Sequence, residues 1–275
     1  MSVQTLDNRL AVLGVGKMGG ILLQAFLRQG LVKPDQVFAT VKHPETAEAL
    51  SRRLKVGVGT DNVAAAEKSD IILICVKPQT VRQVAEEISS LLTPDKLVIS
   101  IAASVPTDYI EAVLSKGVPV VRAMPNTPCT VGAGMTGICR GRFAQKDHVR
   151  LTRRLFETVG RVVRVDEKHM DAVTGLSASG PAFIYIILES LAEAGVKVGL
   201  PRDVATLLAA QTAHGASQVV LETGDHPALL RDAVTTPAGC TVDGVLELEE
   251  GKLRVTLIKA VVKASERARE LLLSK

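Results

Sequence analysis

The stretch LAVLGVGKMG, residues 10–19, decides the fold of the first half of this chain. An apolar run, LAVL, leads into GVGKMG, which fits the pattern GxGxxG, and a segment with helical spacing of apolar residues follows. In this context Gly14 permits a tight turn, Gly16 lets a pyrophosphate approach the backbone, and Gly19 allows close packing of the helix. The N-terminus of that helix offers N–H groups to phosphate. The stretch therefore predicts a dinucleotide site; the alternative is a glycine turn without a ligand.

The pattern around this turn predicts an α/β fold up to about residue 165. Short apolar runs without alternation are typical of strands covered on both faces, and they alternate with segments of helical spacing. This repetition predicts a mostly parallel, Rossmann-type sheet. The strands are expected at residues 10–13, 36–41, 70–76, 97–102 and 118–122, with added edge strands at 134–139 and 161–165, and the helices at 18–29, 46–54, 80–92 and 107–114.

The remainder of the chain, residues 166–275, reads as all-α. Apolar residues recur at helical spacing at 183–194, 202–221, 242–250 and 253–273. Several of these helices are apolar on more than one side, and about 110 residues form too small a core to bury so much apolar surface. We therefore expect a dimerisation domain and a homodimer or larger homo-oligomer built through the C-terminal helices.

Composition narrows the classes of function. The net charge of +4 comes from scattered Lys and Arg, and only 3% of the residues are aromatic, so no nucleic-acid partner is expected. The four cysteines form no CxxC pair and the five histidines no metal spacing, which predicts no metal site and a reducing, cytoplasmic location. The N-terminal residues show no secretory pattern, and no apolar stretch reaches the ~18 residues of a membrane span, so no membrane partner is expected.

The end of the predicted second strand favours NADPH over NADH. An NAD site usually places an acidic residue there, which binds the ribose 2′-hydroxyl. Here Thr40, Lys42 and His43 stand in its place, and a hydroxyl and positive charge suit a 2′-phosphate. The alternative is that Lys42 and His43 form a solvated turn, and NADH remains possible.

Polar or small residues follow the next predicted strands at the edge where parallel sheets bind ligands. These segments are residues 75–79, 100–104 and 122–128, the last with polar Arg122, Asn126 and Thr127. In the helical half, residues 176–183 and 235–241 break the helical pattern. The N–H groups of Gly239, Cys240 and Thr241 are expected to face outward at a helix start, where they suit a carboxylate. Ordinary helix caps are an equal alternative for both segments.

Together these segments resemble the pyrroline-5-carboxylate reductase family. The matching stretches are GVGKMG (14–19), CVKPQ (75–79), RAMPNTP (122–128), LSASGPAF (176–183), AGVKVGLPR (194–202) and LRDAVTTPAGCT (230–241). The resemblance implies an NAD(P)H-dependent oxidoreductase that acts on a C=N bond and reduces 1-pyrroline-5-carboxylate to L-proline, the last step of proline biosynthesis. It also implies a nucleotide-binding domain followed by a helical substrate-binding and dimerisation domain.

The resemblance also assigns site residues. Substrate-carboxylate contacts would fall on Thr236, Gly239, Cys240 and Thr241. Two departures are Ala178 and Ala238, which stand where the family often has glycine, and we expect both to adopt ordinary negative φ. Cofactor contacts would fall on Leu13, Gly14, Val15, Gly16, Lys17, Met18, Asn62, Cys75, Val76, Lys77, Pro78, Ser100, Ala102 and Ala103.

The chemistry expected of the protein is modest, because the cofactor supplies the hydride. Thr241 is the candidate for a hydroxyl hydrogen-bonded to the ring nitrogen. A β-hydroxyacid dehydrogenase would need a lysine after the glycine-containing loop, and residues 180–189 contain none. A catalytically silent NADP-binding regulator would need polar loops only in the first domain, whereas this chain has them in both.

Overall fold

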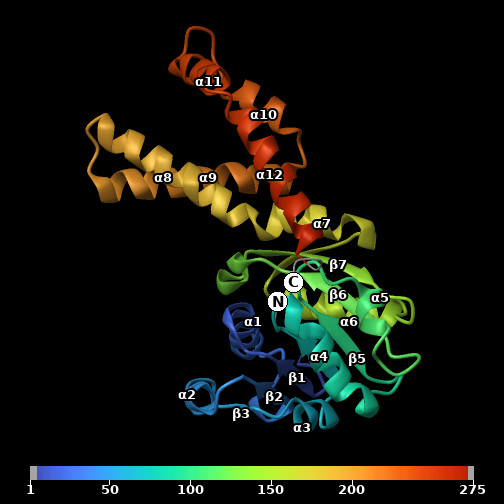
Figure 1. Cartoon of the computed structure of the whole chain (residues 1–275). Helices are drawn as coiled ribbons and strands as arrows, with labels where there is room; N and C mark the ends of the chain where they lie inside the picture. Colours follow the sequence, from blue (N-terminus) through green and yellow to red (C-terminus); the bar gives the residue numbers. More distant parts are fainter. Residues whose placement is uncertain (1–4, 272–275) are drawn as a thin grey trace. The chain divides into compact units, whose positions relative to one another are not determined.

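The computed structural model describes residues 5–271, which form two compact units. One unit contains the chain up to Ser179 together with the segment from Lys263 onward, and the other contains Gly180–Val262 (Figure 1). The predicted domain boundary at residue 165 lies before this division, which falls between Ser179 and Gly180. Residues 167–178 stay with the first unit, where Arg122 faces the carboxylates of Glu167 and Asp171. The division into domains at residue 165 stays a prediction.

The first unit is built on an eight-stranded sheet with the order β3-β2-β1-β4-β5-β6-β7-β8. All neighbouring strands are parallel except β6 and β7. This confirms the predicted α/β class and both added strands, whereas β3 was missed because two of its three residues are glycine. The strands are β1 (Leu10–Leu13), β2 (Val37–Thr40), β3 (Gly57–Gly59), β4 (Ile71–Ile74), β5 (Leu97–Ser100), β6 (Val120–Met124), β7 (Gly134–Arg140) and β8 (Gly160–Arg164).

Helices cover both faces of this sheet. Alternate residues of β1 show it: Leu10 and Val12 belong to one buried cluster, and Ala11 and Leu13 to the other. Burial on both faces is why these strands are apolar throughout. The first cluster includes residues of α1 (Lys17–Arg28), α2 (Pro44–Leu54) and α6 (Lys146–Glu157), and the second includes residues of α3 (Asn62–Glu67), α4 (Pro78–Ile88) and α5 (Thr107–Glu111).

Short helical turns complete the first unit. After β8 the chain runs through three helical segments that end at the unit boundary. The turns are η1 (Pro34–Gln36), η2 (Ser89–Leu91), η3 (Thr127–Val131) and η4 (Glu167–His169), followed by α7 (Met170–Val173) and the π-helical segment η5 (Thr174–Ala178).

The second unit is helical, as predicted, and has almost no large side chain in its interior. Its elements are α8 (Gly180–Lys197), α9 (Arg202–Thr223), α10 (Pro227–Ala233), α11 (Cys240–Glu250) and the first part of α12 (Leu253–Glu270). The buried residues of α8 and α9 are Ala192, Ala205 and Ala209. A Cβ added at Gly195 would lie 2.8 Å from the Cβ of Ala205, so small residues let these two helices approach closely.

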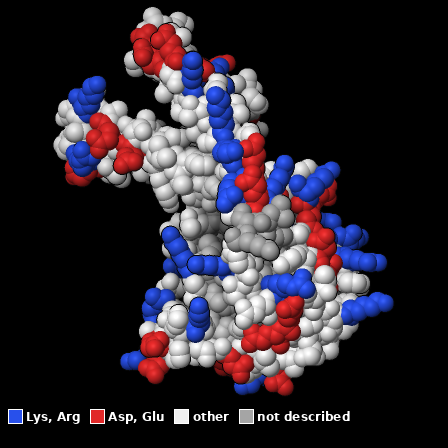
Figure 2. All heavy atoms as spheres, in the orientation of Figure 1, with Lys and Arg blue, Asp and Glu red and all other residues white. Residues whose placement is uncertain are grey.

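Large apolar side chains of the second unit face outward. Figure 2 shows an uncharged surface over much of α8 and α9, with charged residues gathered at the end of the hairpin. Such a surface on a single chain marks an interaction site. The exposed residues of the two helices include Ile184, Tyr185, Ile186, Leu191, Val204, Leu207, Leu208, Val219 and Leu221.

One helical run in the described residues, Glu167–Lys197, is long and apolar enough by composition to cross a membrane. The prediction that no stretch has this length is therefore wrong. The sequence pattern places a break in the helix at residues 176–183, whereas η5 and α8 fall within this single helical run. Length and composition are weak evidence for a span, because a helix packed inside an oligomer has the same character.

Candidate functional site

The glycine turn between β1 and α1 has the predicted geometry. Gly14 has φ +86°, a conformation that side chains disfavour. A Cβ at Gly19 would lie 2.9 Å from the Cβ of Cys75, so α1 approaches β4 closely. A Cβ at Gly16 would meet no atom within 4 Å, which leaves open space beside the backbone. The turn therefore combines a tight bend, close packing and an open approach.

The start of α1 offers unused N–H groups beside that space. Gly16 is the N-cap, no side chain caps the helix, and the first turn contains no acidic residue. The Gly20 amide donates the first hydrogen bond of the helix to the Gly16 carbonyl, at 2.9 Å. Within residues 5–271, the amides of Lys17, Met18 and Gly19 have no backbone acceptor. These donors and the positive helix end fit a pyrophosphate.

Thr40 anchors the glycine turn to the end of β2. Its carbonyl accepts hydrogen bonds from the amides of Gly14 (3.1 Å) and Val15 (2.7 Å), and its hydroxyl accepts a longer one from Gly14 (3.2 Å). The hydroxyl donates to Oδ1 of Asn62 at 2.7 Å. The sequence predicts that Thr40 contacts a 2′-phosphate. Its hydroxyl hydrogen is already donated to Asn62, so none remains for that contact.

A pocket of about 790 Å³ lies along this turn and the ends of β2 and β4. It brings together nine of the predicted cofactor residues. Its lining also contains one carboxylate, Glu87, and three basic residues, Lys42, His43 and Lys77. Both Lys42 and His43 are exposed. The nine residues are Gly14, Val15, Gly16, Thr40, Lys42, Asn62, Cys75, Val76 and Lys77.

Seven predicted cofactor residues do not line this pocket. Leu13 and Ser100 are fully buried, and the Ser100 hydroxyl accepts the Ala102 amide at 3.3 Å. Lys17 and Met18 contribute the amides at the start of α1. Pro78 is the first residue of α4, and the others, Ala102 and Ala103, follow β5. Their contact with a cofactor stays a prediction.

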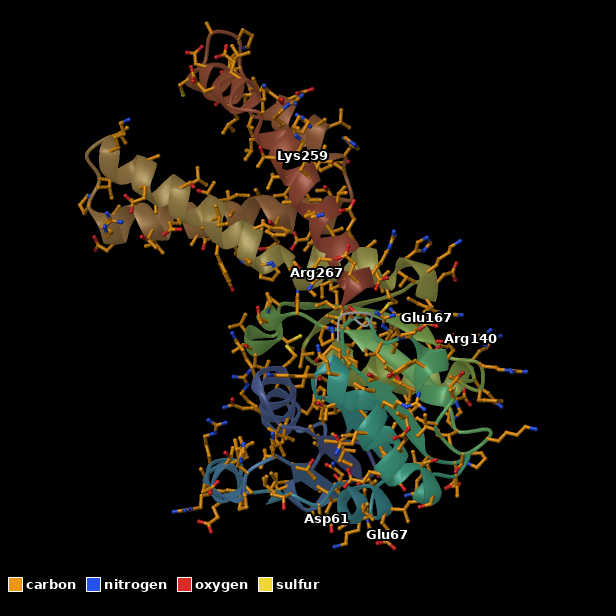
Figure 3. The ribbon with its side chains drawn as sticks, viewed as in Figure 1. Asp61, Glu67, Arg140, Glu167, Lys259 and Arg267 are labelled. Atoms are coloured by element: carbon orange, nitrogen blue, oxygen red, sulfur yellow. The ribbon has the colours of Figure 1, made fainter. Side chains whose placement is uncertain are left out.

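Sequence reasoning missed Glu87, which holds Asn62 in place. The Asn62 Nδ2 donates to Glu87 Oε2 at 3.0 Å. Asn62 begins α3, next to Asp61, whose carboxylate accepts the Ala64 amide at 2.9 Å and caps the helix (Figure 3). Because Glu87 lies 25 residues further along the chain, no local motif connects the two residues.

The polar residues of the loop at 122–128 are used inside the protein. Arg122 is 3% exposed and lies 3.5 Å from Asp171 and 3.9 Å from Glu167. Asn126 donates to the Ser177 carbonyl at 3.1 Å and accepts the Met135 amide at 2.9 Å. The expectation that these side chains face a ligand is not supported, because both are used in internal contacts: Arg122 pairs with η4 and α7, and Asn126 links η5 to β7.

Glu167, which lies beside Arg122, also binds the start of α5. Its two carboxylate oxygens accept the amide and the hydroxyl of Thr107, each at 2.7 Å, at the start of α5. Figure 3 labels Glu167 beside the sheet of the first unit, near Arg140. Arg122, Glu167 and Thr107 therefore form a structural link between β6, η4 and α5.

In the second unit, the segment before α11 forms a turn and a helix start. The helix begins at Cys240, earlier than the predicted residue 242, with Gly239 as N-cap. The Gly239 amide donates to the Thr236 carbonyl at 3.0 Å, so the prediction that this amide is available to a ligand is wrong. Among the described residues, the amides of Cys240 and Thr241 have no backbone or capping partner. Two donors at a helix start remain for a carboxylate.

Ala238 adopts φ +56°, so the prediction of ordinary φ is wrong at this position. The 3.0 Å hydrogen bond from Gly239 to Thr236 spans Pro237 and Ala238. Proline at the second position and positive φ at the third are the pattern of a type II turn. Ala178, the last residue of η5, is not among the residues with positive φ, which confirms the expectation there.

The thiol in the nucleotide pocket is not ionised at neutral pH, because burial raises the pKa of Cys75. Burial likewise raises the pKa of Cys139 to about 12. Both side chains act as small apolar groups. Within residues 5–271, no group of three or more His, Cys, Asp or Glu side chains is placed to hold a metal ion.

Comparisons with known proteins agree with this geometry. Residues 9–104 match the family model described as NADP oxidoreductase coenzyme F420-dependent, and residues 167–271 match pyrroline-5-carboxylate reductase dimerisation. A pyrroline-5-carboxylate reductase of Methanosarcina acetivorans is 42% identical over 265 residues, which are 96% of this chain and 98% of that protein.

Two solved structures share the whole fold. The pyrroline-5-carboxylate reductase of Coxiella burnetii has a TM-score of 0.88 at 35% identity, covering 97% of this chain and 99% of that one. The pyrroline carboxylate reductase of Plasmodium falciparum, solved with NADP bound, has a TM-score of 0.87 at 28% identity, covering 97% and 98%. With near-complete coverage at 42% identity and a matching dimerisation segment, this chain belongs to the pyrroline-5-carboxylate reductase family.

Proposed function

We propose that this chain is a pyrroline-5-carboxylate reductase, which reduces 1-pyrroline-5-carboxylate to L-proline with NADPH in the last step of proline biosynthesis. The near-full-length similarity to enzymes of that name carries the proposal. Two features support it: the open glycine turn of the first unit, and the pair of unpartnered amides at the start of α11.

The residues present fit a dinucleotide with a 2′-phosphate. The pyrophosphate is assigned to the amides at the start of α1, and the 2′-phosphate to the exposed Lys42 and His43. Bound NADPH supplies a hydride to the substrate. Because the pocket lining has three basic residues and one carboxylate, its charge favours the additional phosphate of NADPH.

The substrate contacts are assigned to the segment at Thr236–Thr241. The amides of Cys240 and Thr241 bind the substrate carboxylate, and the Thr236–Gly239 turn holds them at the helix start. Asp243 also lies in this first turn, so the two amides rather than net charge must select the carboxylate. The Thr241 hydroxyl hydrogen-bonds the ring nitrogen and keeps the substrate's C=N bond oriented for reduction.

The proposed enzyme is a cytoplasmic homodimer or larger homo-oligomer. Its C-terminal helices match a dimerisation family and present large apolar side chains at their surface, which a second copy would cover. Four unpaired thiols suit a reducing compartment.

An assay of NADPH oxidation with 1-pyrroline-5-carboxylate tests the proposal. We expect loss of the NADPH absorbance only when the imine is present, and no gain of that absorbance when NADP is mixed with a β-hydroxyacid. Thr241→Val should lower kcat by about tenfold or more while NADPH binding is retained. Turnover of the hydroxyacid in place of the imine would refute the assignment.

A further inference from the structure

We propose that Glu87 is a positioning residue for the cofactor: acting through Asn62 and Thr40, it fixes the wall of the nucleotide pocket and the glycine turn beside it. This inference rests on the proposed NADPH-dependent function and adds a residue that the sequence motifs do not include. Glu87 lies near the end of α4, on the exposed side of the helix, and lines the pocket.

A continuous set of hydrogen bonds connects Glu87 to the glycine turn. The Gly14 amide donates to the Thr40 hydroxyl at 3.2 Å, and that hydroxyl donates to Asn62 Oδ1 at 2.7 Å. The Asn62 Nδ2 then donates to Glu87 Oε2 at 3.0 Å. In every bond the donor lies on the side of the glycine turn and the acceptor on the side of the carboxylate. Hydrogen bonds in such a chain strengthen one another.

The carboxylate decides which way the Asn62 amide faces. A hydroxyl both donates and accepts, so Thr40 alone does not distinguish the oxygen of Asn62 from its nitrogen. A carboxylate only accepts, so the face of Asn62 towards Glu87 must be the NH₂ group. With that choice made, the Asn62 oxygen faces Thr40, and the second amide hydrogen of Nδ2 remains for a ligand.

This orientation matters because of where Asn62 lies. Thr40 ends β2 and contacts both Asn62 and the Gly14 amide. In dinucleotide-binding folds, the region between the glycine turn and the end of the second strand receives the ribose next to the pyrophosphate. A misplaced Asn62 would therefore weaken binding of the adenosine part, and it would release the Thr40 hydroxyl from its partner.

The negative charge of Glu87 also affects binding, although positioning of Asn62 does not require it. Glu87 is the one acidic group among the lining residues, in a pocket assigned to phosphates, where its charge alone would weaken NADPH binding. Positioning needs only a hydrogen-bond acceptor. Glu87→Gln keeps an acceptor and removes the charge, whereas Glu87→Ala removes both, so these two variants separate the roles.

Equilibrium binding to the purified full-length protein tests the role. NADPH binding is followed by nicotinamide fluorescence, and binding of 2′,5′-ADP, which carries the 2′-phosphate without a nicotinamide, by calorimetry. We expect Glu87→Ala and Asn62→Ala each to raise both dissociation constants by about five- to tenfold, and Glu87→Gln to stay within about twofold of the parent. Glu86→Ala is the matched control, because the neighbouring Glu86 pairs with Arg82 and does not line the pocket.

A double-substitution cycle tests whether the residues act as one unit. Thr40→Val removes the middle of the chain at nearly constant volume, and Thr40→Ser restores its hydroxyl. We expect Glu87→Ala to change the NADPH dissociation constant by less than about twofold when Thr40→Val is already present. In steady state, Glu87→Ala should raise the KM for NADPH and leave kcat at saturating NADPH unchanged.

Two outcomes would overturn the inference in different ways. If the parent protein binds NADPH but Glu87→Ala equals Glu86→Ala, or Glu87→Gln is as weak as Glu87→Ala, Glu87 has no positioning role. If the parent binds neither NADPH nor 2′,5′-ADP, the cofactor assignment fails and the role of Glu87 fails with it.

Discussion

Ala238 holds a left-handed backbone conformation, φ +56°, in the turn that leads into α11. Such a conformation costs a residue with a side chain roughly 1–2 kcal/mol relative to glycine. Glycine loses more chain entropy on folding, which offsets part of the gain. We expect Ala238→Gly to raise the free energy of unfolding by about 0.5–1 kcal/mol, measured by urea unfolding. Ala210→Gly, in the exposed middle of α9, should lower it by about 1 kcal/mol. Destabilisation by Ala238→Gly would show that the turn is not strained.

Lys42 is the exposed basic residue at the end of β2 that is assigned to the 2′-phosphate of NADPH. NADH lacks this phosphate, so a charge that contacts it affects only one of the two cofactors. We expect Lys42→Ala to raise the KM for NADPH by about tenfold and the KM for NADH by less than about twofold. Lys146→Ala, at the exposed start of α6, is the control. Equal effects on the two cofactors would remove Lys42 from the site.

At the residue scale, what the sequence could predict depended on distance along the chain. Gly14 and Gly19 were predictable because the demands of a tight turn and a close approach are local. The partners of Thr40 and Asn62 were not, because Asn62 is 22 residues from Thr40 and 25 from Glu87. The positive φ of Ala238 could have been predicted, since proline at the second position of a four-residue turn favours a positive φ at the third.

Glu111, at the end of α5, illustrates a carboxylate that links two elements. Its Oε1 accepts the Arg142 amide at 2.7 Å, in the segment between β7 and α6. Desolvation raises the pKa of Glu111, the hydrogen bonds from Arg142 and Phe143 oppose this, and the nearby carboxylates of Glu167 and Asp108 raise it further. The folded protein therefore holds a proton on Glu111 at a pH where the unfolded chain has released it.

This shift predicts how stability depends on pH. Because the folded pKa lies above the unfolded value near 4.5, the contribution of Glu111 is fully present below that value and is lost as pH rises through the folded pKa. We expect Glu111→Gln, which keeps an acceptor for Arg142, to make the unfolding free energy fall less steeply with pH across this window. Urea unfolding at several pH values measures the slope. Glu48→Gln, at an exposed site of α2, is the matched control for the loss of one carboxylate.

At the element scale, strands were more predictable than the ends of helices. Continuous apolar runs located β1, β4 and β5, because strands buried on both faces need apolar residues throughout. The short strand β3 carries two glycines among three residues and has no such signal. The start of α11 at Cys240 depends on the preceding turn, which apolar spacing does not record.

At the scale of the whole molecule, the two units differ in how they bury apolar surface. In the first, two clusters of large side chains fill both faces of the sheet. In the second, the buried residues of α8 and α9 are alanines, and large apolar side chains lie outside. The sequence predicted this, since a helix that is apolar on several sides cannot be covered by a unit of this size.

The exposed face of the second unit makes oligomerisation testable with one substitution. Leu207, in the first half of α9, is 68% exposed in the single chain, so Leu207→Asp should not disturb the fold of that chain. If a second copy covers this face, the new carboxylate loses its water without gaining a partner, which costs several kcal/mol and favours dissociation. We expect the parent to have the mass of a dimer or larger assembly in light scattering, and Leu207→Asp to shift it towards the monomer.

Val131→Asp, at a 78% exposed site of the first unit, is the matched control and should retain the parent mass. A parent protein that is monomeric at every concentration, or equal dissociation by both substitutions, would contradict assembly through the helical unit.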